Sequence, residues 1–171
     1  MEHERPFVFA RAAVRYKDTA KDLIRILKFE RNLEAVHWLG IWLCEAWTRY
    51  FAEIPFDYIV PVPLHPDRLR HRGFNQAYVL AKQLSEYSGI PILEPLQRIS
   101  TRSSQASRTR IERLRSFEGA FQCSETFHNK VSNANILLVD DVFTTGATVE
   151  ACTKELLHKG CTGVWVLTVA R

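Results

Sequence analysis

An apolar run that ends in two acids and a small hydroxylated loop constrains this sequence more than any other feature. Residues 136–139, Ile-Leu-Leu-Val, show no polar alternation, which is typical of a central parallel strand covered on both faces. Asp140 and Asp141 follow directly and are expected at the carboxyl end of that strand. In open parallel sheets, ligands bind at this edge. The pattern predicts an α/β fold with a binding site beside the two acids.

The loop after the acids has the composition of a phosphate-binding turn. It consists of Thr144, Thr145, Gly146, Ala147 and Thr148. A helical pattern follows over residues 148–159, and the N–H groups and positive dipole at a helix start bind phosphate. A carboxylate only accepts hydrogen bonds, so the two acids suit neighbouring ribose hydroxyls and repel a phosphate. The segment is therefore interpreted as a cradle for a ribose phosphate.

This run resembles the phosphoribosyl-pyrophosphate (PRPP) signature of type I phosphoribosyltransferases, in which an apolar strand ends in two acids and a Thr/Gly-rich loop. A Walker B-like strand or an acidic metal site would be alternatives, but the seven glycines form neither G-x-x-x-x-G-K-[ST] nor G-x-G-x-x-G. A pair of acids that only caps a helix stays open as a further alternative.

Other segments resemble the ComF family of competence-associated, phosphoribosyltransferase-like proteins. They are residues 9–16, 27–29, 57–65, 68–76, 105–113 and 119–121. The resemblance implies a doubly wound, mostly parallel sheet of the type I phosphoribosyltransferase kind, with N-terminal helices and a flexible hood loop. We expect one domain over residues 1–171, with a helical N-terminal part at 1–54 and a PRPP-binding core at 55–171.

The sequence departs from the family pattern in one large respect, the zinc module. Members of the family commonly carry a four-cysteine zinc module before the stretch that matches Phe9. Here the cysteines are Cys44, Cys123, Cys152 and Cys161, without a C-x-x-C pair, so no structural zinc is predicted. Whether the sequence is truncated or a natural variant stays open.

Composition favours a compact cytoplasmic protein. A chain of 171 residues with 46% hydrophobic content can bury one core, and scattered cysteines suggest reduced thiols. The N-terminus lacks an apolar signal region, and the longest apolar stretch, residues 36–44, is too short to span a bilayer. Neither secretion nor membrane insertion is expected, and an oligomer is left open.

The net charge of +4 is unevenly distributed. Residues 68–115 carry nine arginines and Lys82 against three acids, which gives +7 and leaves −3 for the rest of the chain. Arginine suits bidentate phosphate contacts. A solvated helix face is the alternative, but serines and threonines fill the gaps where alternating acids would be expected.

Periodicity predicts the remaining elements. Helices are expected at residues 17–29, 33–51 and 74–87, and strands at 58–62 and 163–170, with 89–93 as the start of another strand.

The resemblance also assigns the pyrophosphate contacts. The loop after the first sheet strand would contact pyrophosphate through Val62, Pro63, Leu64 and His65, although a solvent-exposed loop histidine is an equal alternative for His65. Residues 100–116 correspond to the hood, in which Arg108 and Arg113 are the candidates for pyrophosphate. Arg70 and Arg72 would stand at the entrance of the helix at 74–87. Such donors accelerate the departure of an anionic leaving group.

The implied reaction is transfer of phosphoribosyl from PRPP to a nitrogen acceptor, with Asp140 and Asp141 as catalytic residues and pyrophosphate as the leaving group. PRPP would carry Mg²⁺, which one of the two acids contacts through water, so no direct protein ligand is expected. The acceptor stays open, and Phe143 would either stack on a base or pack. Two alternatives remain: a PRPP sensor or scaffold without turnover, and a protein that handles single-stranded nucleic acid. Family resemblance adds competence and DNA-uptake proteins, or single-stranded DNA, as partners.

Overall fold

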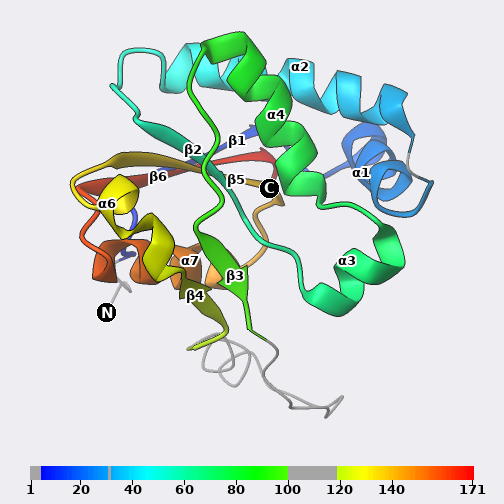
Figure 1. The fold of residues 1–171 in the computed structure, drawn as a ribbon. Helices are drawn as coiled ribbons and strands as arrows, with labels where there is room; N and C mark the ends of the chain where they lie inside the picture. Colours follow the sequence, from blue (N-terminus) through cyan, green and yellow to red (C-terminus); the bar gives the residue numbers. More distant parts are fainter. Residues whose placement is uncertain (1–4, 31, 100–118) are drawn as a thin grey trace.

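Four parallel strands form the central sheet of the structure, a computed structural model that describes residues 5–30, 32–99 and 119–171 (Figure 1). Their order is β1-β6-β5-β2. The strands are β1 (Ala10–Val14), β2 (Tyr58–Pro61), β5 (Asn135–Val142) and β6 (Gly163–Ala170). In register, Leu138 lies between Val60 and Val166. Because all four strands run the same way, their carboxyl ends share one edge of the sheet.

Helices cover both faces of this sheet. On one face lie α1 (Asp18–Glu30), α2 (Leu33–Tyr50) and α4 (Gln76–Ser88). The opposite face packs against α7 (Ala147–His158) and, nearby, α6 (His128–Val131) with a 3₁₀ turn at Glu125–Phe127. In the view of Figure 1, α2 and α4 lie above the sheet and α7 lies below it. None of the described helices is both long and apolar enough to cross a membrane.

Two further pieces extend the carboxyl side. The short helix α3 (Pro66–Arg72) follows β2. The strands β3 (Leu96–Arg98) and β4 (Phe121–Cys123) form a separate antiparallel pair.

The two layers of core follow the alternation of β5. Leu137 and Val139 pack with α1, α2 and α4, whereas Ile136 and Leu138 pack with α7. All four are fully buried. Successive side chains of a strand point to opposite faces, so a strand covered on both sides needs apolar residues at every position. The same alternation sends Asp140 and Asp141 to opposite faces of the sheet.

The predicted doubly wound parallel fold is confirmed. The helices expected at 17–29, 33–51, 74–87 and 148–159 are α1, α2, α4 and α7, and the strand at 163–170 is β6. The strand at 136–139 is longer than expected and contains both acids.

The prediction that a strand starts at residues 89–93 is wrong. Only Ile92 forms an isolated parallel bridge, to Ile59. Pro91 and Pro95 bracket this bridge, and proline has no N–H to extend a ladder. The next strand, β3, joins β4 instead.

Residues 10–14 also differ from the expectation of a helical N-terminal part. Their sequence, Ala-Arg-Ala-Ala-Val, has no strong strand preference, yet it forms β1 at the sheet edge beside β6. Pairing with a neighbouring strand outweighs intrinsic propensity here.

The central position of β5 sets the stability of the fold. We expect Leu137→Ala to lower the free energy of unfolding by about 3 kcal/mol, because it removes a fully buried side chain and leaves a cavity. Leu157→Ala makes the same change where the side chain is 37% exposed, and should cost less than about 1 kcal/mol. Urea denaturation of both variants measures the difference. Equal losses would contradict the assignment of the core.

Candidate functional site

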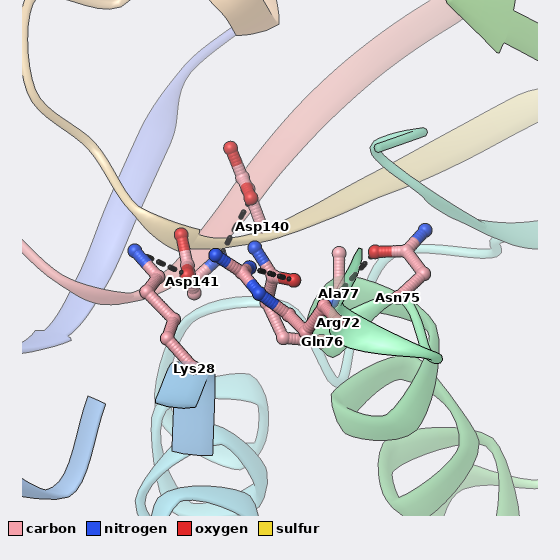
Figure 2. Close-up of polar contacts among 7 residues, drawn as sticks. All are labelled: Lys28, Arg72, Asn75, Gln76, Ala77, Asp140 and Asp141. Carbon is pink, nitrogen blue, oxygen red and sulfur yellow. Dashed lines mark hydrogen bonds and ion pairs between the residues drawn. The ribbon is translucent and has the colours of Figure 1, made fainter. Parts of the chain in front are cut away.

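The two acids at the end of β5 form the centre of the site (Figure 2). Asp141 is buried, at 5% exposure, and Asp140 is partly exposed. The backbone N–H of Asp141 donates a hydrogen bond of 2.8 Å to Oδ1 of Asp140. Two carboxylates are thus held side by side at the edge where the parallel strands end.

Lys28 brings a positive charge to this pair. It lies in the last turn of α1, and its Nζ is 2.7 Å from Oδ2 of Asp141. The contact is an ion pair without hydrogen-bond geometry, and no described residue donates a hydrogen bond to this buried oxygen. Oδ2 therefore keeps the capacity to accept a hydrogen bond from a ligand hydroxyl.

Asp140 lies in a different environment, on the side of α7. Burial, and then the neighbouring Asp141 carboxylate, raise the pKa of Asp140. The backbone N–H of Asp141 and the charge of Lys28 oppose this shift. Beneath it, burial and then the Asp140 carboxylate raise the pKa of the Cys152 thiol. A carboxyl group whose pKa is raised by burial and by a like charge is typical of a functional site.

The loop predicted to bind phosphate ends at the start of α7. Gly146, the N-cap residue, has a φ of 88°, a left-handed conformation that favours glycine. No side chain caps this helix start; nearby, the N–H of Ala147 makes a long hydrogen bond of 3.4 Å to Oγ1 of Thr145. The first N–H groups of a helix that lacks a cap can bind an anion.

Arg5 lies beside this loop, next to Gly146, and no sequence pattern predicted it. Its Nη1 is 3.3 Å from Oε1 of Glu150, and its guanidinium lies 5.2 Å from the ring centroid of Phe143. Phe143 is only 7% exposed and meets Phe7 edge to face at 6.3 Å. Of the two predicted roles for Phe143, the structure therefore favours packing.

The loop at Val62–His65 is held against the same edge. Val62 donates its N–H to the Val139 carbonyl at 2.9 Å, which continues the β2–β5 ladder. Asn75 caps α4 through Oδ1 and donates Nδ2 to the Val62 carbonyl at 3.0 Å. Pro63 and Leu64 line a cavity of about 510 Å³ that also borders Arg98.

His65 is the N-cap of α3. Its Nδ1 accepts the N–H of Asp67 at 3.2 Å. A nitrogen that accepts a hydrogen bond carries no proton, so the 3.5 Å approach of Nδ1 to the Asp67 carboxylate is not a salt bridge. With Nδ1 engaged at the helix start, Nε2 is the ring nitrogen left for contact with a ligand.

The arginines near the two acids differ in burial and in how strongly they interact with the acids. Arg72 donates to Oε1 of Gln76 at 2.6 Å; burial lowers its pKa, and the Asp141 carboxylate opposes that shift. Arg98, at the end of β3, also has a pKa lowered by burial and then by Arg68, with Asp140 among the opposing charges. Arg70 is 75% exposed and pairs with Asp67 at the surface.

The structure thus brings Asp140, Asp141, Arg72 and the two predicted loops to one edge. It adds Lys28, Arg98 and Arg5, which sequence reasoning missed as site residues. Arg108 and Arg113 lie outside the described residues. Within the described ranges, no group of three or more His, Cys, Asp or Glu residues could hold a metal ion.

Comparison with solved structures defines the class. Yeast (Saccharomyces cerevisiae) adenine phosphoribosyltransferase superposes with a TM-score of 0.51 at 14% sequence identity, over 81% of this chain and 71% of that one. No family model matches the chain. The fold is that of the type I phosphoribosyltransferases.

Sequence comparison narrows this class to a family. Competence protein ComFC of Bacillus subtilis is 33% identical over 150 residues, which cover 88% of this chain and 58% of that protein. ComFC of Streptococcus pneumoniae is 33% identical over 161 residues, which cover 94% of this chain and 67% of that protein. The chain belongs to the ComF family of competence proteins, as the sequence predicted. It spans less than two thirds of the length of the B. subtilis relative.

The raised pKa of Asp140 has a measurable cost in stability. Between the ordinary value of 3.8 and the raised value, the native state binds more protons than the unfolded state, so stability falls as pH rises. We expect Asp140→Asn to raise the free energy of unfolding at pH 7 by ~1 kcal/mol, a gain that disappears as the pH is lowered below the ordinary value.

Asp141→Asn is the matched control, because it removes the partner of Lys28 and should lower stability at pH 7. Urea denaturation across pH compares the two variants. A loss of stability in Asp140→Asn equal to that in Asp141→Asn would contradict the account.

Proposed function

We propose that this protein binds PRPP with Mg²⁺ and transfers its phosphoribosyl group to a nitrogen acceptor, releasing pyrophosphate. The observation that carries the proposal is that two acids and a helix start without a side-chain cap lie within a few residues of each other. Asp141 has a buried oxygen that accepts no hydrogen bond from a described residue, and α7 begins at Ala147. Hydroxyl acceptors and phosphate donors stand next to each other in that segment, which matches a ribose phosphate.

Each part of PRPP then has a place. The 5-phosphate would bind the loop of Thr144, Thr145, Gly146, Ala147 and Thr148. The 2- and 3-hydroxyls of the ribose would donate to Asp140 and Asp141. The pyrophosphate would face the loop of Val62, Pro63, Leu64 and His65, where Nε2 of His65 is a donor.

Arginines would complete the pyrophosphate subsite. Arg72 lies close enough to Asp141 for the carboxylate to affect its pKa, and Arg98 stands in the same relation to Asp140. Arg108 and Arg113 of the hood remain proposed contacts. Arg70 would have to leave Asp67 to take part.

The donor set fits a magnesium ion that arrives with the substrate. Mg²⁺ prefers oxygen ligands, keeps several waters, and is commonly held by one or two carboxylates together with substrate phosphates. Asp140 or Asp141 would accept a hydrogen bond from one of its waters. The ion would supply charge neutralisation to the pyrophosphate.

The residues of the chain would act by position and charge. Asp140 and Asp141 hold the ribose by its hydroxyls and place negative charge near the sugar as its C1 becomes cationic. His65 and Arg72 donate toward the departing pyrophosphate, where negative charge develops. The acceptor nitrogen would form the new bond to C1 while the bond from C1 to the pyrophosphate oxygen breaks; the electron pair of that bond would leave with pyrophosphate, and the nitrogen would lose its proton to water.

Calorimetric titration of PRPP with Mg²⁺ tests this proposal. Wild-type protein is expected to bind saturably, and the Asp140→Asn/Asp141→Asn variant to lose at least about tenfold in affinity, because amides are weaker acceptors for hydroxyls than carboxylates. Asp22→Asn, an exposed change on α1, should bind like wild type. Absence of binding to folded wild-type protein would overturn the proposal. Binding without pyrophosphate release across a panel of nitrogen acceptors would favour a sensor.

One observation favours a second function, the handling of single-stranded nucleic acid. Phe29 is 74% exposed, and the guanidinium of Arg72 lies 6.0 Å from its ring centroid. Aromatic rings beside cations bind unpaired bases and their phosphates. The relatives are named competence proteins, and we propose a role in handling single-stranded DNA for this chain as well.

Salt dependence separates the two functions. If single strands are a partner, their affinity should fall steeply as salt rises, survive Asp140→Asn, and weaken in Phe29→Ala, because phosphate contacts release counterions and bases stack on the ring. Fluorescence anisotropy with a short labelled oligonucleotide measures this. Affinity that is absent at low salt would exclude the second function.

A further inference from the structure

Lys28 contacts Asp141 and also lines a neighbouring cavity. Its Nζ pairs with Oδ2 of Asp141 at 2.7 Å, and its side chain, 25% exposed, also lines a cavity of about 590 Å³. The other residues around this cavity are Phe29, Asp67, Arg68, His71 and Arg72. In Figure 2, Lys28 and Arg72 approach Asp141 from neighbouring positions.

The cavity carries an excess of positive charge. Arg68 and Arg72 both line it, and their mutual repulsion adds to the effect of burial in lowering the pKa of Arg72. Among the described residues, Asp67 is the only acid that lines this cavity, and Arg70 already pairs with it. An anion in the cavity would relieve this repulsion.

Away from the cavity, Lys28 covers Oδ2 of Asp141, the atom to which a ribose hydroxyl would donate. Oδ2 of Asp141 is buried and has Lys28 as its charged neighbour. A sugar hydroxyl that binds this oxygen must share it with the ammonium or displace it. Displacement leaves an ammonium without its partner, which is costly unless another anion takes the place of the carboxylate.

PRPP provides that second anion, whereas ribose 5-phosphate does not. Both molecules carry the ribose hydroxyls and the 5-phosphate, but only PRPP carries a diphosphate at C1. A ligand shifts a conformational equilibrium only by its differential affinity for the two states. The diphosphate would supply such a difference by drawing the ammonium into the cavity.

We infer that Lys28 is a specificity-determining residue. Its ammonium moves from Asp141 to the diphosphate when PRPP binds, and the site therefore selects PRPP over ribose 5-phosphate. The inference rests on the proposed function, since it takes PRPP as the ligand of the two acids. It adds a residue from α1 to a site that the sequence assigned to β5 and its loops. It also gives the ion pair of the free protein a role in discrimination.

The test compares two ligands across matched variants. Calorimetry measures the affinities of PRPP with Mg²⁺ and of ribose 5-phosphate for wild type, Lys28→Met, Lys28→Arg and Lys21→Met. Lys21 is an exposed lysine on the same helix and controls for the loss of charge. If Lys28→Met does not fold because Asp141 loses its partner, Lys28→Gln takes its place.

The expected result is a change in the ratio of the two affinities. Lys28→Met should weaken PRPP by about tenfold or more, because a charged donor to the diphosphate is lost, while ribose 5-phosphate binds as well as before or more tightly. Lys28→Arg and Lys21→Met should keep a ratio near that of wild type. A ratio that stays unchanged in Lys28→Met, or moves in favour of PRPP, overturns the inference, while PRPP binding to wild type still upholds the PRPP site of the proposed function. Failure of wild type to bind PRPP overturns both.

Discussion

Two adjacent carboxylates at the end of a buried parallel strand are the constraint around which this structure is arranged. Strand alternation forces Asp140 and Asp141 to opposite faces of the sheet. On one face, Lys28 of α1 pairs with Asp141. On the other face, the Asp140 carboxylate raises the pKa of Cys152 of α7 and opposes the lowering of the Arg98 pKa. One short sequence therefore organises elements from both layers of the molecule.

The energetic character of the two acids differs for the same reason. Asp141 is buried but has an opposite charge at 2.7 Å, which offsets much of the cost of its burial. Asp140 accepts a backbone hydrogen bond from Asp141, which opposes a pKa raised by burial and by the neighbouring carboxylate. The fold keeps a destabilised carboxylate at the edge where we propose that the ligand binds, as expected where function and stability compete.

The sequence was most informative where local pattern and tertiary role coincide. The apolar run of β5 predicted a central strand, and the loop after it predicted the start of α7. Lys28, Arg5 and Arg98 could not be assigned in this way, because each reaches the site from a distant element through tertiary contacts. Sequence spacing carries no signal for Lys28 approaching Asp141 from the end of α1, 113 positions earlier in the numbering. The misplaced strand at 89–93 shows the opposite failure, in which apolar residues suggest a strand that flanking prolines prevent.

A crystal structure of the protein with PRPP and Mg²⁺ tests the central claim most directly. The account predicts the 5-phosphate within hydrogen-bond distance of the backbone N–H groups of the loop at 144–148, and the ribose hydroxyls on Asp140 and Asp141. Density for PRPP at another edge of the sheet, with Asp141 still paired with Lys28, would contradict it.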